Sequence, residues 1–310
     1  MTRGERIVKR KGLLLFIVML LSLSMIGTAS AAPKLRIMVN NSSVDVGVQI
    51  VSGQTLVPLK AFERFKNTSI QWDANTKQAT IARDSMKIKL TVGSRTAWKN
   101  SEAVQLDVSA KIVDGRVAVP LRFIAEALGA RVTVDAATNT VWVQERANAK
   151  LVQNYNSNDL VVSRIAALQF PVEEREPSKL TGDNEALSMT YYFPEGRSDG
   201  YFIMYGHFVK YYEIKDNIVK VVWEADLDMS KEATNKDFTA IFGYPVAKEY
   251  GKAPVLAPSY ASFYTSVWGS QIIYGMVHAD GTTKVSGQSL TWDDTRKPFV
   301  VAIPGETKLQ

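Results

Sequence analysis

The stretch Gly-Arg-Val-Ala-Val-Pro-Leu-Arg-Phe-Ile-Ala-Glu-Ala-Leu-Gly-Ala, residues 115–130, decides the fold of the first half of the chain. It opens on a hairpin signal, because Asp114 and the glycine after it accept the backbone of a tight two-residue turn. Pro120 then begins a short helix, where its missing N–H has no partner to lose, and Gly129 ends that helix. One face of the helix carries apolar residues at helical spacing: Leu121, Ile124, Ala125 and Leu128.

The same pattern occurs once before in the chain. Residues 53–59, Gly-Gln-Thr-Leu-Val-Pro-Leu, match residues 115–121, and the match continues without a gap through the hairpin that follows each helix. We call two residues equivalent when this gapless match aligns them. A gapless match over about thirty positions favours duplication of one unit over chance. Between the two copies, residues 86–92 alternate as a strand with one buried face does.

We therefore expect an α+β protein. A duplicated module of antiparallel β-hairpins and short helices would occupy residues 32–146, and a second antiparallel-sheet α+β domain would occupy residues 161–310. Residues 147–160 contain the run Asn-Tyr-Asn-Ser-Asn-Asp and are expected to form a polar linker.

In the second domain we expect a helix capped by Asp159 and a helix from Ser230 to Phe242 that ends at Gly243. Runs of alternating apolar residues predict the strands of an antiparallel sheet. These strands are expected at residues 187–193, 200–205, 208–214, 218–223, 271–278, 283–292 and 299–303.

The N-terminus has the features of a secretory signal peptide. Five basic residues precede an apolar run, and Ala29-Ser-Ala31 supplies the small residues that a signal peptidase accepts. We expect cleavage after Ala31, so that residues 1–31 are lost. The alternative is an uncleaved anchor, but the apolar run of roughly 15 residues is shorter than the ~20 that span a bilayer. We therefore expect a secreted protein, either free or associated with the cell wall, without a stable membrane anchor after cleavage.

Charge and cysteine content exclude several classes. The chain carries +6, but the leader holds five basic residues and one acidic residue, so its removal leaves +2. Net charge therefore gives no argument for a nucleic-acid partner. The chain has no cysteine, which excludes a disulfide framework, a thiolate metal site, a cysteine nucleophile and a lipoprotein anchor.

Residues 115–130, together with Val134-Asp135 and the run Thr-Asn-Thr-Val-Trp-Val at 138–143, resemble the copper amine oxidase-like N-terminal domain. This "stalk" domain occurs in secreted proteins of Gram-positive bacteria. The resemblance covers roughly residues 35–146, and the first copy matches it less closely. It implies an architectural or adhesive role, because in amine oxidases the domain lies away from the catalytic copper and brings no active site with it. The second half resembles no family.

The sequence argues against an amine oxidase. Such enzymes bind copper through three histidines, and this chain has only His207 and His278. No cofactor and no metal site is therefore expected. Asp293-Asp294 offers hard oxygen ligands for calcium, but we favour a turn that ends a strand as the explanation for these residues. Neither histidine lies in a recognised catalytic motif.

Aromatic residues are dense in the second half, and their faces could stack on sugar rings. The candidate glycan-stacking residues are Tyr192, Tyr212, Trp223 and Trp268. The competing interpretation is that these rings fill a β core, as β-propensity favours.

Taken together, the residues predict a non-catalytic envelope or extracellular protein. Its stalk module would be structural or adhesive, and its partner would be cell-wall glycan or another envelope protein. The alternative is a secreted hydrolase whose active site lies in the second half, with a histidine within reach of a nucleophile or a carboxylate. A small-ligand binder would instead require a deep apolar pocket there.

Overall fold

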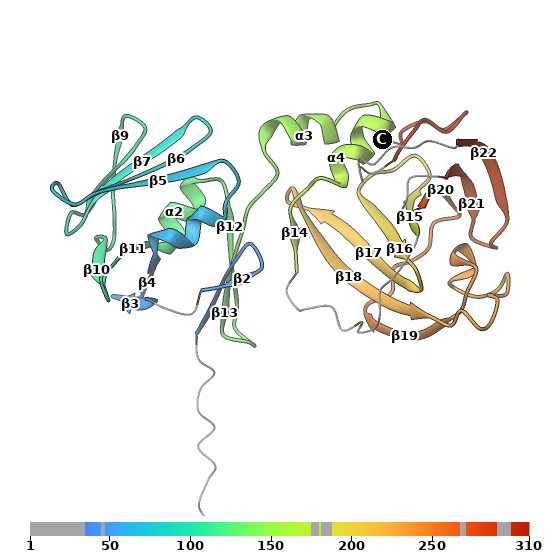
Figure 1. Cartoon of the computed structure of the whole chain (residues 1–310), viewed down its shortest axis with the longest axis horizontal. Helices are drawn as coiled ribbons and strands as arrows, with labels where there is room; N and C mark the ends of the chain where they lie inside the picture. Colours follow the sequence, from blue (N-terminus) through green and yellow to red (C-terminus); the bar gives the residue numbers. More distant parts are fainter. Residues whose placement is uncertain are drawn as a thin grey trace, which may run out of the picture.

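The computed structural model describes residues 35–44, 47–174, 180, 188–266, 271–289 and 299–309. The predicted leader lies outside these residues. Figure 1 shows two β-rich halves side by side, and we call them the N-terminal half (residues 35–146) and the C-terminal half (residues 147–309). Antiparallel sheets dominate both halves and helices are few, in agreement with a sheet-rich α+β class.

One small sheet of the N-terminal half has its strands in the order β10-β11-β4-β3. These strands are β3 (Gln49–Val51), β4 (Gln54–Pro58), β10 (Lys111–Val113) and β11 (Arg116–Pro120). β4 and β11 pair antiparallel, with Val57 opposite Val119 and with Leu56 and Pro58 opposite Pro120 and Ala118. Because Val57 and Val119 are equivalent residues of the two copies, the register is symmetric about this pair.

Each central strand leads directly into a helix. β4 leads into the 3₁₀ helix η2 (Leu59–Arg64), and β11 leads into α2 (Leu121–Ala127). The apolar stripe of α2 is buried as predicted, and Gly129 takes the left-handed conformation after it (φ 80°). Asn67 takes that conformation in the first copy (φ 58°), which asparagine tolerates better than most residues.

Two further sheets cover the helices. One has the order β5-β6-β7-β8-β9, and the other has the order β12-β13-β1-β2. Their strands are β5 (Thr68–Asp73), β6 (Gln78–Arg83), β7 (Met86–Thr91), β8 (Thr96–Lys99), β9 (Glu102–Gln105), β12 (Arg131–Asp135), β13 (Thr140–Gln144), β1 (Arg36–Val39) and β2 (Ser42–Ser43). Their inner faces and both helices bury one core that includes Ile37, Phe62, Ile81, Ile124 and Val143.

Elements β3, β4, η2, β5 and β6 recur later in the chain, in the same order, as β10, β11, α2, β12 and β13. The hairpin turns recur in detail as well. The Asp73 carboxylate accepts the hydroxyl of Thr76 at 2.7 Å, and the Asp135 carboxylate accepts the hydroxyl of Thr138 at 2.9 Å. Such local bonds hold the turn without help from the rest of the fold.

Arg83, at the end of β6, and Glu145, just after β13, form a buried ion pair. These two residues are equivalent. Arg83 also donates to the carbonyl of Leu128 at 2.6 Å, while Glu145 accepts the N–H of Lys66 at 3.4 Å. Lys66 and Leu128 are again equivalent residues. Each charge thus binds the backbone at the end of the other copy's helix.

The C-terminal half is built on one large sheet. Its order is β14-β18-β17-β16-β15-β20-β21-β22, and β19 also pairs with β18. The strands are β14 (Val172–Glu173), β15 (Ser188–Pro194), β16 (Gly200–Tyr205), β17 (Phe208–Lys215), β18 (Ile218–Leu227), β19 (Val246–Gly251), β20 (Ser259–Ser266), β21 (Ile272–His278) and β22 (Thr283–Ser289). Helices α3 (Ala149–Tyr155) and α4 (Leu160–Ala167) pack over one face, and the short helix η3 (Ala240–Phe242) packs over the other.

Several predictions for this half are confirmed and others are wrong. Asp159 caps α4 as expected, accepting the N–H groups of Val161 and Val162. The predicted helix over 230–242 is reduced to η3, because the preceding segment forms turns around Asp228 and Asp237. The predicted strand at 299–303 is irregular, although its apolar residues are buried in the core.

The stretch predicted as a linker is largely helical and fixed in place. Asn148 caps α3 by accepting the N–H of Leu151 at 2.9 Å. Next to it, Arg131 of β12 binds Glu173 of β14 at 2.7 Å and Asp216 at 3.2 Å. Asn41 pairs its amide with β14 as a peptide group would, donating to the carbonyl of Val172 and accepting the N–H of Glu174. We call these contacts of Asn41 and Arg131 the polar clamp; they fix one half against the other.

Candidate functional site

Of the aromatic residues proposed for glycan stacking, the structure places Tyr192 and Trp223 in the core and Tyr212 against it. Trp223 is 1% exposed and donates its indole N–H to Glu249 at 2.7 Å. Tyr192 is 7% exposed and packs edge-on against Phe242. A buried ring has no free face for a sugar, so the stacking interpretation fails for Tyr192 and Trp223. The competing interpretation, a filled β core, accounts for them.

Tyr212 is partly buried and stacks on Tyr201, with ring centroids 5.1 Å apart and planes 17° from parallel. Tyr201 therefore covers the ring face of Tyr212 on which a sugar was expected to stack. Burial raises the pKa of Tyr192 and of Tyr212 to about 12, so both stay protonated at neutral pH. Trp268 lies outside the described residues, as do Asp293 and Asp294.

The best catalytic candidate is a histidine–carboxylate pair. His207, in the turn between β16 and β17, approaches Asp226 of β18 with Nδ1 and Oδ1 2.6 Å apart. The two side chains are 37% and 33% exposed. Within the described residues, His207 makes no hydrogen bond to a serine or threonine hydroxyl. Among the residues that the structure describes, the pair thus places a carboxylate against the imidazole, with no hydroxyl nucleophile bonded to it. His278, at the end of β21, is exposed and takes no part in it.

A second polar cluster, which sequence reasoning missed, joins the C-terminal segment to α4. Ser163 and Ser198 share a hydrogen bond of 2.7 Å, and the ammonium of Lys308 lies 3.3 Å from the Ser163 hydroxyl. A serine beside a lysine is a known nucleophile–base combination. Here, however, Ser163 is 0% exposed, and Lys308 also donates to the carbonyls of Tyr155 and Ser157. The cluster is closed to substrate and holds the C-terminal segment in place.

The same segment carries a buried ion pair. Arg164 binds Glu306 at 2.5 Å and 2.8 Å, with side chains 1% and 3% exposed. Its guanidinium lies over the rings of Phe193 and Phe263, 5.2 Å and 5.9 Å from their centroids. No pattern in the sequence marks Arg164 and Glu306 as partners, because they lie far apart in the chain.

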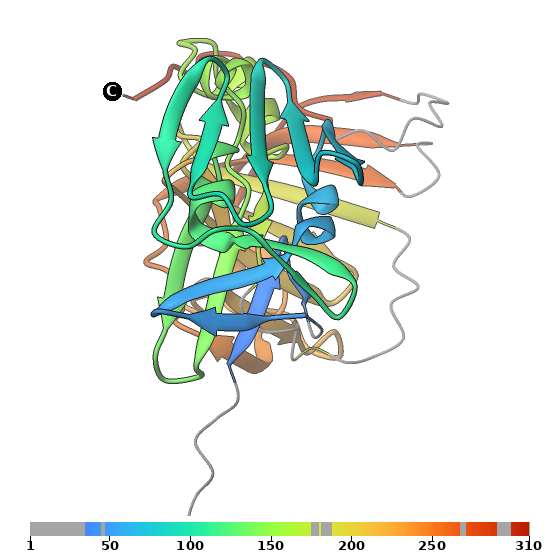
Figure 2. The ribbon, with the colours of Figure 1, turned by 90° about the vertical axis from the view of Figure 1, so that its left-hand side faces the viewer.

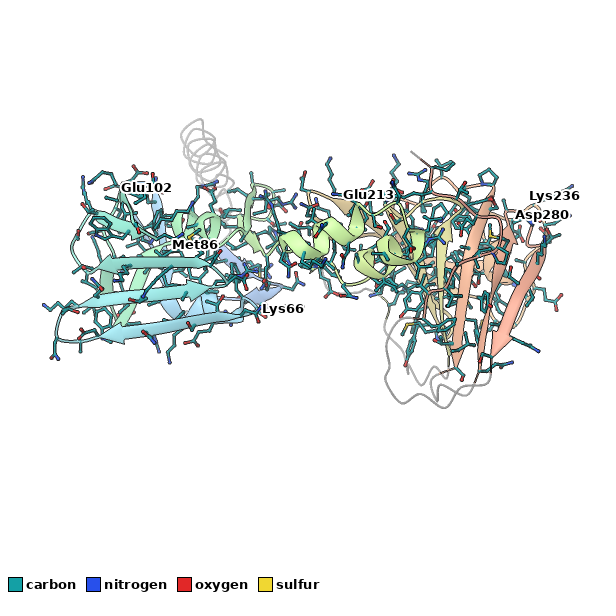
Figure 3. The ribbon with its side chains drawn as sticks, turned by 90° about the horizontal axis from the view of Figure 1, so that it is seen from above. Lys66, Met86, Glu102, Glu213, Lys236 and Asp280 are labelled. Carbon is teal, nitrogen blue, oxygen red and sulfur yellow. The ribbon has the colours of Figure 1, made fainter. Side chains whose placement is uncertain are left out.

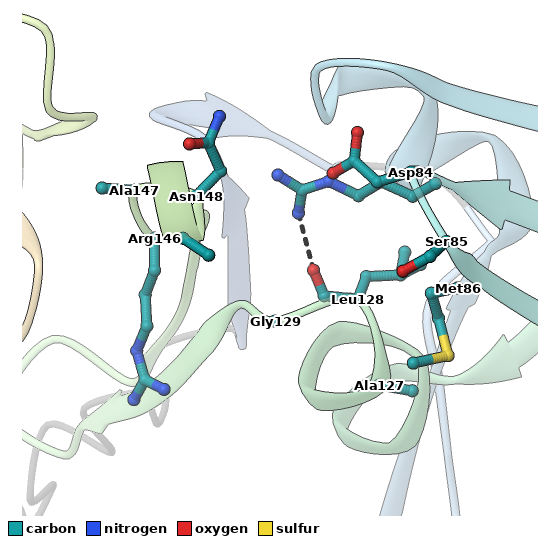
Figure 4. Close-up of a pocket in the computed structure, with 11 residues that line it drawn as sticks. Asp84, Ser85, Met86, Ala127, Leu128, Gly129, Arg146, Ala147 and Asn148 are labelled. Carbon is teal, nitrogen blue, oxygen red and sulfur yellow. Dashed lines mark hydrogen bonds between the residues drawn. The ribbon is translucent and has the colours of Figure 1, made fainter. Parts of the chain in front are cut away.

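Figure 4 shows a pocket of about 290 Å³ at the boundary between the two halves. It is lined by the β6–β7 turn (Asp84, Ser85, Met86), by the end of α2 (Ala127, Leu128, Gly129) and by residues 146–149. The hydrogen bond from Arg83 to Leu128 crosses its wall. Asp84 and Arg146 are its charged residues beside Arg83, and Figure 4 shows them pointing in different directions. This mixed lining does not form the deep apolar site that a small-ligand binder requires.

Among the described residues, no group of three or more histidine or acidic side chains is arranged to hold a metal ion. In the same part of the chain, no helix is both long and apolar enough to cross a membrane.

Comparison with known proteins bears on the N-terminal half. Residues 38–143 match the family model of the copper amine oxidase N-terminal domain. This segment is a copper amine oxidase N-terminal domain. The match begins in β1 and ends in β13, so it takes in both helices and all three small sheets. It covers about a third of the chain and stops before α3. No curated protein matches the chain.

Proposed function

We propose that the protein is exported and that its copper amine oxidase N-terminal domain is a non-catalytic stalk. In this proposal the stalk holds the C-terminal half at the cell envelope, in contact with wall glycan or a surface partner. The polar clamp is the observation that supports it. A domain that fixes its neighbour through Arg131, Asn41 and Glu173 is suited to presenting that neighbour in one orientation.

We also propose that the stalk arose by duplication of a unit of about sixty residues. The repeated order of elements, the two aspartate turns and the symmetric β4–β11 register support this origin. The first copy differs from the second in its helix. Leu59–Arg64 forms a 3₁₀ helix where the second copy has an α-helix.

The proposal is tested by locating the protein and measuring wall binding. The full chain is produced in a Gram-positive host, and the mass of the mature protein is determined from culture medium and from washed walls. We expect loss of residues 1–31 and pelleting with purified wall sacculi. A chain that keeps its leader and stays in the cytoplasm would overturn the export proposal. A mature chain that never pellets would overturn wall binding.

A second candidate, a hydrolase, is favoured by one observation, the 2.6 Å contact between His207 and Asp226. It requires a nucleophile close to the other ring nitrogen. A screen with ester, amide and glycoside substrates tests it on the full chain, with His207→Ala and His278→Ala compared. Activity lost only in His207→Ala would establish the pair as catalytic.

A further inference from the structure

The five-stranded sheet of the stalk carries a continuous row of side chains on its outer face, which is turned away from the core. Each strand contributes one residue, and each is the direct cross-strand partner of the next. The row is Gln71 (β5), Thr80 (β6), Lys89 (β7), Trp98 (β8) and Ala103 (β9). With strands about 4.8 Å apart, it extends over about 19 Å.

This row lies open to solvent. Trp98 is 46% exposed, although an indole is usually among the more buried side chains. Figure 2 shows the strands of this sheet, in teal, nearest the viewer and with the C-terminal half behind them. Figure 3 shows the same sheet at the end of the molecule away from the C-terminal half.

The equivalent face of the other copy is covered. Thr80 is equivalent to Trp142, and Ala82 is equivalent to Gln144. Trp142 is 6% exposed and Gln144 3% exposed, on the sheet whose Arg131 binds Glu173 and Asp216 of the C-terminal half. The stalk therefore already uses this face of one copy as a contact surface, while the corresponding face of the other copy is open.

The composition of the open face favours a sugar chain over a protein. Among its described residues, Trp98 is the one large apolar side chain. The rows on either side add hydroxyl, amide and charged groups together with one alanine: Ser69, Ala82, Lys87 and Asn100 on one side, and Asp73, Gln78, Thr91, Thr96 and Gln105 on the other. Protein interfaces need a cluster of apolar anchors at their centre, which this face does not provide. A pyranose ring needs one flat aromatic surface for its C–H face and flanking groups that bond its hydroxyls.

The charge of the face specifies the sugar chain further. Within the described residues, Lys87 and Lys89 form no ion pair, so both ammonium groups are available. The acid on this face, Asp73, lies at its edge strand, and its carboxylate is occupied by Asn75 and Thr76. The face is therefore positive near its centre, which complements a glycan that carries carboxylates.

We propose that this face, centred on Trp98 and Lys89, binds an extended peptidoglycan strand, whose pyranose backbone bears carboxylate-containing substituents. The inference rests on the proposed function and assigns its wall-contact site to the stalk instead of the C-terminal half. Trp98 stacks on one sugar ring, Gln71 and Thr80 bond hydroxyls along the row, and Lys87 and Lys89 meet the carboxylates.

The test is co-sedimentation of the full chain with peptidoglycan sacculi that have been stripped of their anionic polymers. Trp98→Ala is compared with Trp72→Ala, a matched control on the same sheet. Trp72 is 39% exposed, but it shares the core-facing row of Ala79 and Leu90, away from the proposed surface. We expect Trp98→Ala to weaken binding about tenfold, the loss of one aromatic contact, and Trp72→Ala to leave it unchanged. Lys89→Gln should weaken binding and make it less sensitive to salt.

Other outcomes separate this inference from the proposed function. If the wild-type chain pellets with sacculi and Trp98→Ala pellets equally well, the protein binds walls through another surface and this inference is wrong. If binding requires the anionic polymers, the ligand is not peptidoglycan and the inference is also wrong. If the wild-type chain does not bind walls at all, this inference and the wall-binding part of the proposed function are both wrong, while export is decided by the mass of the mature protein. Thermal melting of each variant verifies that the exposed substitutions leave the fold intact.

Discussion

Replacing Arg131 by methionine tests whether the polar clamp holds the two halves together. The Glu173 side chain is 0% exposed and Arg131 13% exposed, so the pair is largely buried. Removing one partner of a buried ion pair costs about 3–5 kcal/mol, because the remaining charge keeps its desolvation penalty. Water can reach Arg131, and Lys220 lies 3.9 Å from Glu173, so we expect a loss near about 3 kcal/mol.

Urea denaturation followed by circular dichroism measures this loss. Arg122→Met is the matched control, since Arg122 pairs with Glu126 on α2 with both side chains more than half exposed. Such an exposed pair contributes at most about 0.5 kcal/mol. The double variant Arg131→Met/Glu173→Met removes both charges and should recover part of the loss.

Calorimetry provides a second readout. If the clamp joins the halves, Arg131→Met should split one unfolding transition into two. A variant that unfolds in a single transition and loses no more stability than Arg122→Met would refute the reasoning, because the clamp would then be a superficial contact.

Three further predictions concern buried groups. Arg83→Met leaves Glu145 buried beside the end of η2 and should lower the free energy of unfolding by about 3 kcal/mol in urea denaturation. Adding Glu145→Met to this variant should restore part of the loss. Equal losses in both variants would contradict this. Glu306→Ala removes the partner of Arg164 and should free the C-terminal segment. The N–H of Leu309, which donates to the carbonyl of Gly196, should then exchange faster with solvent hydrogen. Unchanged exchange at this group would show that Lys308 alone holds the segment. Tyr192 has its pKa raised to about 12 by burial, so the unfolded chain loses this proton first as pH rises past about 10. The stability that it contributes is complete below about pH 10 and is lost between about pH 10 and 12; tyrosinate absorbance should rise and urea midpoints should fall together across that range, and a flat midpoint would argue against a buried hydroxyl.

The N-terminal half was largely readable from its sequence because its signals are local. Asp114 and its following glycine set a turn, and Gly129 ends a helix, each through the conformation of one or two residues. The predictions failed where distant contacts or competing local bonds decide the outcome. Apolar spacing over 230–242 favours a helix, but carboxylates such as Asp237 bond nearby N–H groups and form turns instead.

The functional residues were less predictable because they depend on contacts across the fold. The sequence does not show whether Tyr192 and Trp223 are buried or exposed. Alternation assigns them to a face of the sheet but does not say which face is covered. The clamp joins Arg131 to Glu173 through an interface that forms only once both halves are folded. Trp98 belongs to strand β8, which was not among the predicted strands, so its outward row could not be identified from spacing.

The symmetric register between β4 and β11 bears on whether the stalk pairs within one chain or between two chains. Antiparallel pairing about the equivalent residues Val57 and Val119 has the geometry of a two-fold homodimer, which the duplication that we propose would join into one chain. Two separate first copies could pair through β4 in the same way, but Arg83 would then face a second Arg83 in a buried position. Two second copies would likewise bring Glu145 against Glu145. Because this chain places opposite charges at the two equivalent positions, pairing of the first copy with the second within one chain is favoured over pairing of identical copies from two chains.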